Sequence, residues 1–193
     1  MTKPALHHIN LKTTRISEMI DWYGKVTGMT VSHQAPAGAW LTNDEANHRI
    51  ALLAFPWLSD NPSKEGHTGL HHTAFEYPSF QDLFDSYARL RDLEIAPVVC
   101  LDHGITTSMY YSDPDSNFVE LQVDNFGDWS KSSECIKTSR EFAANPIGVF
   151  FNPTLVYEAF RSGRSPSELH AAITAGHFLP DPVPVIGPPQ ARA

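Results

Sequence analysis

Positive charge is scarce in this sequence. It has 14 lysines and arginines against 22 aspartates and glutamates, which gives a formal net charge of -8 at neutral pH. A chain with this balance repels polyanions. Nucleic acids and anionic membrane surfaces are therefore not expected among its partners.

Cysteines are few, and long apolar runs are missing. The two cysteines, Cys100 and Cys135, do not make a disulfide framework, which favours a reducing cytoplasm. No apolar run is long enough to span a bilayer, and the opening MTKPALHH lacks the apolar region of a signal peptide. With 193 residues, 41% of them hydrophobic, the sequence predicts a cytoplasmic globular protein with a substantial core.

Histidine, in contrast, is abundant, and it reveals an internal repeat. Ten histidines are present, and the tripeptide Leu-His-His occurs at residues 6–8 and again at residues 70–72. Moving the chain by the 64 positions that separate His8 from His72 aligns two stripes with the i, i+3, i+4, i+7 spacing of an amphipathic helix. The first stripe is Ile16, Met19, Ile20, Tyr23 and Val26, and the second is Phe80, Leu83, Phe84, Tyr87 and Leu90.

Short strand-like runs follow each predicted helix. They cover about 29–35, 38–43 and 48–55 in the first half and about 96–102, 106–112 and 117–123 in the second. Gly28 is suited to end the first helix, and Ser79 with Asp82 resembles a capping box at the start of the second. Each half is therefore predicted to be a βαβββ module in an α+β fold.

The alternation of side chains along a strand selects one histidine from each pair. His8 and His72 share a strand face with polar residues, as does Glu120 in the run NFVELQV, while the apolar faces are expected to lie under the helices. His7 and His71 are then expected at helices or at the sheet edge. Two imidazoles and one carboxylate form the facial triad of a non-haem Fe(II) centre, so His8, His72 and Glu120 are predicted metal ligands.

Residues beyond the repeat form an extension. A helix is expected from about 165 to 175, and the proline-rich run 180–189 is not expected to hold regular structure. Aromatic and apolar residues of this region are candidates to close the mouth of a substrate pocket: Phe126, Trp129, Pro146, Val149 and Phe150.

The motifs HHINLKT, NHRIALL, GLHHTAFEY and HGITTSMYYSDPDSNFVELQVDNF carry a resemblance to a known family. Over about residues 4–126 the chain resembles the vicinal oxygen chelate superfamily, and within it the one-domain extradiol catechol dioxygenases of the 2,3-dihydroxybiphenyl type. The resemblance implies two modules, about 4–58 and 68–126, that form one cupped domain around a single metal over residues 1–126. Residues 127–193 are then an extension that packs on this domain.

The resemblance also assigns roles to residues. It places the metal ligands at His8, His72 and Glu120, in agreement with the strand faces. It implies an acid/base at His48 in HRIAL, a substrate-binding tyrosine at Tyr110, ten residues before the carboxylate ligand, and a further catalytic histidine at His103. Ser116 stands where the family usually has glycine, so we expect a positive φ angle there.

The function implied by the resemblance is extradiol cleavage of a catechol, with both atoms of O2 incorporated. The expected cofactor is Fe(II), with Mn(II) as the alternative, because the same ligand set holds either ion. The expected partners are a small aromatic diol, O2 and further copies of the same chain in a homo-oligomer. An aromatic pocket mouth favours a bulky substituted catechol, as in the catabolism of aromatic hydrocarbons.

Other functions share this fold. An isomerase of the glyoxalase type commonly takes a carboxylate ligand from its fourth strand, but NHRIALLAF contains no acid. A metal-dependent thiol transferase uses the same two histidines and one glutamate, but it would need a basic site for which Arg49 alone is thin support. A metal-free binding protein would have no reason to keep His8, His72 and Glu120 together.

Overall fold

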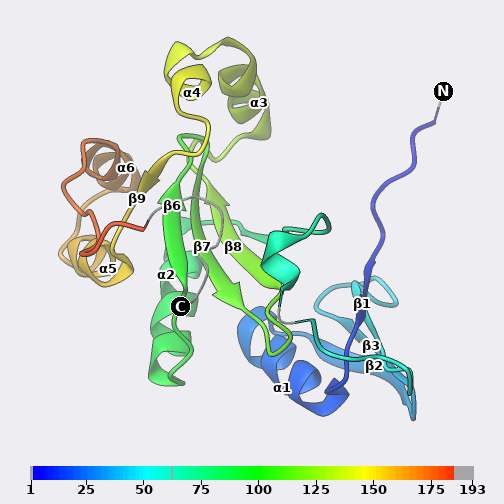
Figure 1. The fold of residues 1–193 in the computed structure, drawn as a ribbon. Coiled ribbons are helices and arrows are strands. Elements are labelled where there is room, and N and C mark those ends of the chain that lie inside the picture. Colours follow the sequence, from blue (N-terminus) through cyan, green and yellow to red (C-terminus); the bar gives the residue numbers. More distant parts are fainter. Residues whose placement is uncertain (1, 62, 185–193) are drawn as a thin grey trace. The chain divides into compact units, whose positions relative to one another are not determined.

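Both halves of the chain contain the predicted βαβββ order. The computed structural model describes residues 2–61 and 63–184. Residues 1–69 together with Asp113–Asn117 form one compact unit, and residues 70–112 with those from 118 onward form a second. Each unit contains one module and its own sheet, coloured blue to cyan and green to red in Figure 1.

The first unit contains a four-stranded sheet and one long helix. Its elements are β1 (Ile9–Lys12), α1 (Ile16–Thr27), β2 (Thr30–Ala35), β3 (Gly38–Thr42) and β4 (Ile50–Leu53), followed by the short helical turn η1 (Lys64–Gly66). The strand order is β1-β4-β3-β2, in which the first and last strands pair in parallel and the others pair antiparallel. β4 begins at Ile50, so His48 lies just before this strand and not within it as the predicted range 48–55 implied.

The second unit repeats this topology and adds a strand. Its module comprises β5 (His72–Tyr77), α2 (Phe80–Asp92), β6 (Val99–Asp102), β7 (Thr106–Ser112) and β8 (Phe118–Asp124). The sheet order is β5-β8-β7-β6-β9, again with the module's first and last strands in parallel. The identical order in both units confirms the fold class predicted from the repeat.

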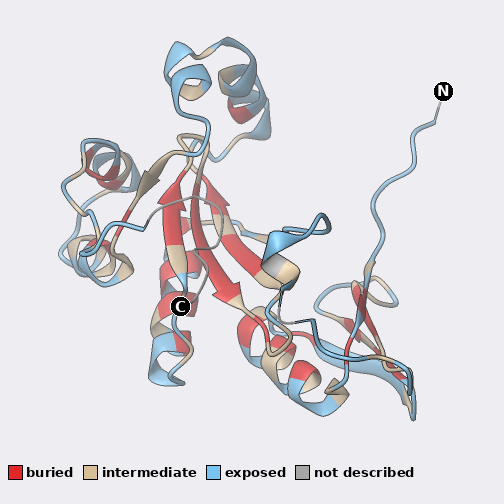
Figure 2. Ribbon diagram, in the orientation of Figure 1, coloured by how far each residue is buried: buried red, intermediate tan, exposed pale blue. Residues whose placement is uncertain are grey.

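The predicted apolar stripes form the core of each unit. Met19, Tyr23 and Val26 of α1 are fully buried against their sheet. All five stripe residues of α2 are buried, and Ser79 accepts a hydrogen bond from the Asp82 amide at the helix start. Figure 2 shows the buried residues along the central strands β6, β7 and β8. Helix α2 packs on β5 and β8 and covers one face of this sheet.

The extension is more structured than the sequence predicted. The expected helix is present as α6 (Pro166–Thr174). Three further helices and a strand were not predicted, namely α3 (Trp129–Thr138), α4 (Arg140–Ala144), α5 (Pro153–Arg161) and β9 (Val149–Phe150). β9 pairs antiparallel with β6 and becomes the edge strand of the sheet. Of the proline-rich run, residues 180–184 form neither helix nor strand, and the rest lies outside the described residues.

Two turns have the backbone conformation that their residues suggested. Gly28 ends α1 with a φ of 70°, and Ser116 has a φ of 61° in the turn between β7 and β8. Ser116 therefore occupies the left-handed region that glycine tolerates best. No helix within the described residues is long and apolar enough to cross a membrane.

Candidate metal and substrate site

The face of the second sheet opposite α2 brings two of the predicted ligands together. β5 and β8 are neighbours in parallel, with Ala74 opposite Glu120 and His72 opposite Phe118. Because every second residue shares a face, His72 and Glu120 project from the same side. The Nε2 atom of His72 lies 3.1 Å from Oε2 of Glu120. Two ligands held at right angles on one ion, each about 2.1 Å from it, lie about 3 Å apart, so this pair fits a metal ion.

Tyr110 lies beside Glu120 on the next strand. The two residues are paired across β7 and β8, and both are buried. Burial favours the neutral form of Glu120, but hydrogen bonds, first of all those from His72 and Ser108, outweigh it and hold the pKa of this carboxyl below its usual value. Burial and the adjacent charge of Glu120 raise the pKa of Tyr110. The carboxylate is therefore ionised near neutral pH, and the free tyrosine is a neutral hydrogen-bond donor.

His103 completes this cluster. Its Nε2 atom lies 2.9 Å from the Tyr110 hydroxyl and 4.0 Å from Oε1 of Glu120. Its Nδ1 atom lies 2.6 Å from the carbonyl oxygen of Ile147 in the extension. A carbonyl oxygen only accepts hydrogen bonds, so Nδ1 carries a proton. In the neutral ring Nε2 is then the acceptor, and the Tyr110 hydroxyl donates to it.

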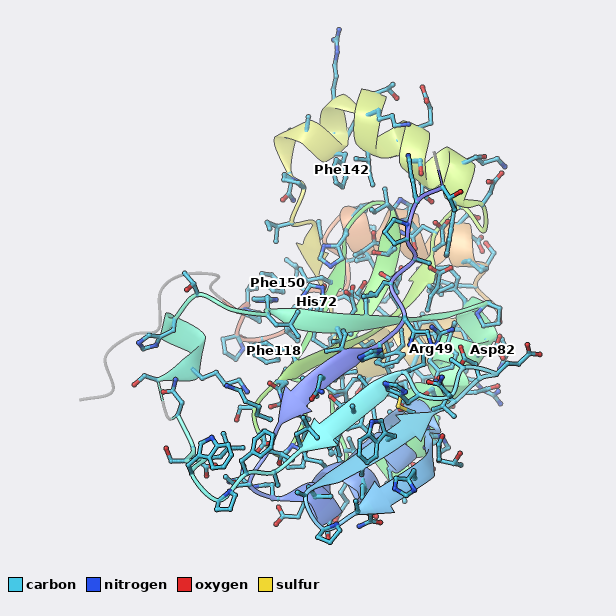
Figure 3. All side chains as sticks on the ribbon, turned by 90° about the vertical axis from the view of Figure 1, so that its right-hand side faces the viewer. Arg49, His72, Asp82, Phe118, Phe142 and Phe150 are labelled. Carbon is cyan, nitrogen blue, oxygen red and sulfur yellow. The ribbon has the colours of Figure 1, made fainter. Side chains whose placement is uncertain are left out.

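The cluster lies at the wall of a largely apolar cavity of about 390 Å³. The residues that line it are His71, His72, Val99, Leu101, His103, Tyr110, Phe118, Ile147 and Phe150. Figure 3 shows His72, Phe118 and Phe150 close together, with Phe142 farther along the extension. An apolar cavity with a few polar groups at one wall is the usual form of a small-molecule site.

The first unit contains a second histidine cluster. His8 directly precedes β1, and the backbone amide of Ile9 donates to the carbonyl of Arg49, next to His48. The rings of His8 and His48 have centroids 4.3 Å apart, and possible ligand atoms of His7, His8 and His48 all lie within 4.8 Å of one another. Partial burial and the neighbouring rings of His8 and His7 lower the pKa of His48. The neutral form of His48 is thereby favoured.

The structure thus assembles the predicted residues in two groups. His72, Glu120, Tyr110 and His103 lie together in the second unit, and His8 and His48 lie together in the first. His71 lies directly before the edge strand β5, as expected, and it also lines the cavity with its ring 5.7 Å from that of Phe118.

Of the residues expected at the pocket mouth, Phe150 lines this cavity. Phe126 and Val149 line a neighbouring cavity of about 500 Å³, and the indole Nε1 of Trp129 donates to Glu76 at 2.8 Å. Val149 and Phe150 are adjacent in strand β9, so they point to opposite faces. The second cavity also contains residues that the sequence did not single out, including Asp102 and His170.

Asp102 is the centre of a buried polar network in the second cavity. It is fully buried and accepts hydrogen bonds from the Gly104 amide at 2.8 Å, from Asn125 at 3.1 Å and from His170 at 2.8 Å. His170 comes from α6, and no local pattern marks it, because its partner is 68 residues away. The network fixes α6 to the end of β6 beside His103.

Comparison with known proteins places this geometry in a family. Residues 5–121 match the model of the Glyoxalase/Bleomycin resistance protein/Dioxygenase superfamily. The chain is 42% identical to "Biphenyl-2,3-diol 1,2-dioxygenase 3" of Rhodococcus globerulus over 86% of this chain and 87% of that protein. It is 38% identical to "Biphenyl-2,3-diol 1,2-dioxygenase 2" of the same organism, over 95% of this chain and 96% of that protein.

Solved structures agree on the fold. The glyoxylase/bleomycin resistance protein/dioxygenase domain from Frankia sp. EAN1pec superposes with a TM-score of 0.53 at 16% identity, over 64% of this chain and 93% of that one. The assignment to a family rests on the family model and on the two relatives. The similarity to the relatives also includes the C-terminal region. The chain belongs to the Glyoxalase/Bleomycin resistance protein/Dioxygenase superfamily and, within it, to the extradiol dioxygenases.

Proposed function

We propose that this protein cleaves the ring of a catechol that bears a bulky apolar substituent, outside the diol and with both atoms of O2 entering the product. The observation that carries the proposal is the apolar cavity with His72, Tyr110 and His103 at its wall. The two biphenyl-2,3-diol dioxygenases to which the chain is similar support the choice of a biphenyl-type diol.

The proposed metal ligands are His8, His72 and Glu120. His72 and Glu120 are already at ligand spacing. His8 is the counterpart of His72 in the repeat and lies one residue before β1, while His72 is the first residue of β5. A single ion held by these three residues requires that residues 1–126 work as one domain. We propose Fe(II) as the ion, with Mn(II) as the alternative, because imidazole and carboxylate ligands suit both. When bound, the ion would supply a Lewis-acid centre that favours ionisation of a diol held in the cavity.

The chain's own residues then orient the diol and handle its protons. Tyr110 would turn its O–H proton from Nε2 of His103 to an anionic substrate oxygen, which it stabilises as a buried donor. His48 serves as the general base that takes a proton from a diol hydroxyl and returns it later in the reaction. His103 acts through its hydrogen bond to Tyr110. The apolar walls Val99, Leu101 and Phe150 exclude water from the reacting ring.

The direct test is loading the protein with Fe(II) without oxygen, then adding 2,3-dihydroxybiphenyl and O2 while following both the yellow ring-fission product and O2 uptake. We expect about one O2 per diol, in keeping with entry of both oxygen atoms into the product. Loading with Mn(II) in parallel identifies the ion. Bound metal without product or O2 uptake, across a panel of substituted catechols, would exclude ring cleavage.

The ligand assignment has its own test, which does not depend on activity. His8→Ala, His72→Ala and Glu120→Ala should each lose metal after dialysis, measured as metal per chain, while His33→Ala on exposed β2 keeps it. Full metal content in any of the three ligand variants would remove that residue from the set. The expected homo-oligomer is checked by sedimentation of the same wild-type sample.

A further inference from the structure

Gly148 of the extension lies directly against the backbone of Asp102 and His103. This residue precedes β9 and has a φ of 93°, a conformation that residues with a side chain rarely adopt. A Cβ atom at this position would overlap the carbonyl oxygen of Asp102 and come within 2.7 Å of the Cα of His103. Glycine is therefore required at position 148 for two reasons, namely the positive φ angle and the lack of room for a Cβ atom beside the Asp102–His103 peptide.

The residue before Gly148 is the one that contacts the His103 ring. The carbonyl oxygen of Ile147 lies 2.6 Å from Nδ1 of His103. Within the described residues, the ring makes one further hydrogen bond, to the hydroxyl of Tyr110. Since the carbonyl only accepts, it keeps the proton on Nδ1 and the lone pair on Nε2. Ring direction and tautomer are thus both set by the extension.

The turn that presents this carbonyl is closed by Asn145. The Asn145 side chain donates from Nδ2 to the Gly148 carbonyl at 2.9 Å and accepts at Oδ1 from the Gly148 amide at 3.1 Å. On the other side of Gly148, Val149 and Phe150 pair with Asp102 and Leu101. The next residue, Phe151, is buried, which anchors the chain. The Ile147 carbonyl is consequently held between two fixed points.

We propose that Gly148 and Asn145 are positioning residues, and that the turn 145–148 holds His103 as the Nδ1–H tautomer with Nε2 directed at Tyr110. The expected effect on turnover rests on the proposed function, whereas the tautomer and direction of the His103 ring do not. It assigns to the extension a role in setting a catalytic histidine. If the turn served only the stability of the fold, the state of the His103 ring would not depend on it.

Nitrogen NMR of the metal-free protein tests the structural content without any assay of activity. The ¹⁵N shifts of the His103 ring, assigned by comparison with His103→Gln, should show a protonated Nδ1 and an unprotonated Nε2 when the imidazole is neutral. Gly148→Ala and Asn145→Ala should each give a mixture of tautomers. An Nε2–H tautomer in the wild type, or an unchanged Nδ1–H tautomer in both folded variants, would overturn the proposal.

Gly163→Ala is the matched control. Gly163 lies in the same unit between α5 and α6 and has a φ of 98°, but a Cβ there meets nothing within 4 Å. It therefore reproduces the backbone strain of Gly148→Ala without the collision. Gly163→Ala should leave the tautomer of His103 and the turnover rate unchanged. If Gly148→Ala does not fold, Asn145→Ala, which keeps the glycine, carries the test.

Kinetics with the Fe(II)-loaded enzyme test the catalytic consequence. Gly148→Ala or Asn145→Ala should lower kcat about 10- to 100-fold, as misplacement of a catalytic group does, with little change in KM and the same metal content. In a His103→Gln background the same changes should lower kcat less than about 2-fold, because the histidine on which they act is gone. An equal loss in both backgrounds would overturn the positioning role. Absence of any turnover in the wild type would refute the proposed function but leave the NMR result standing.

Discussion

Nδ1 of His170 donates a hydrogen bond of 2.8 Å to Oδ2 of Asp102, which joins helix α6 to the end of β6. Asp102 is fully buried, while the His170 side chain is partly exposed. The hydrogen bond to Asp102 is the largest influence on His170 and, with the attraction of its charge, outweighs partial burial and raises the pKa of the histidine above 6.5. The folded protein therefore binds this proton more tightly than the unfolded chain.

The stabilisation by this pair should depend on pH. A raised pKa in the folded state means that the contribution is fully present below 6.5 and is lost as the pH rises through the folded value. His170→Gln should therefore lower the free energy of unfolding of the metal-free protein more at about pH 5.5 than at about pH 9. Urea unfolding of both proteins at the two pH values measures this difference.

The other titratable groups of the same cavity besides Asp102, namely His103, Cys135 and Glu141, are present in both proteins and largely cancel in that difference. His177→Gln, at an exposed histidine just after α6, controls for the exchange of a histidine for glutamine as such. A loss for His170→Gln that is constant with pH would mean that the pair contributes only packing and neutral hydrogen bonding.

Removing the Tyr110 hydroxyl should slow catalysis without removing the metal. Tyr110→Phe is expected to lower kcat about 100-fold, the usual effect of losing one donor to a developing oxyanion. Because His103 acts through this hydroxyl, His103→Gln should add little to the loss in Tyr110→Phe. Steady-state kinetics of the two single variants and the double variant measure this.

Tyr111→Phe is the control for Tyr110, since Tyr111 is adjacent in β7 and faces the α2 side of the sheet, where it is buried. It should keep the wild-type kcat. Multiplicative losses for Tyr110→Phe and His103→Gln would show that the two residues act independently.

His48 is expected to act on protons and not to bind the metal. His48→Ala should lower kcat about 100- to 10,000-fold, the range for loss of a general acid/base, while the metal content stays that of the wild type. Metal analysis and turnover with 2,3-dihydroxybiphenyl separate the two effects. Loss of metal with His48→Ala would instead make His48 a ligand. Its ring centroid lies 4.3 Å from that of His8, close enough for both to bind one ion.

Phe150 should select for the substituent of the diol. It forms a wall of the apolar cavity next to Val99 and Leu101. Phe150→Ala should lower kcat/KM for 2,3-dihydroxybiphenyl about 10-fold or more and leave unsubstituted catechol nearly unaffected, because only the larger diol reaches this wall. Competition between the two diols measures the ratio of their kcat/KM values. Phe142→Ala, in the neighbouring cavity, should leave it unchanged. Equal losses for both diols would place the substituent elsewhere.

Local periodicity in the sequence determined the repeated part of the fold. The stripe Phe80, Leu83, Phe84, Tyr87 and Leu90 can be buried together only on one side of a helix, and the structure buries all five. The alternation in NFVELQV likewise sends Val119 and Leu121 to the helix side and Glu120 to the other. Such patterns depend on neighbours only a few residues away, so they can be read without knowledge of the tertiary structure.

Only the tertiary structure decided what surrounds these residues. The sequence suggested His103 as a site residue but not its contact with the Ile147 carbonyl, which comes from 44 positions later. It gave no sign that His170 would meet Asp102 or that Val149 and Phe150 would add an edge strand to the sheet. These contacts depend on where the extension returns to the sheet. That path is set by the burial of single residues such as Phe151 and by the close approach at Gly148, not by a repeating pattern along the chain.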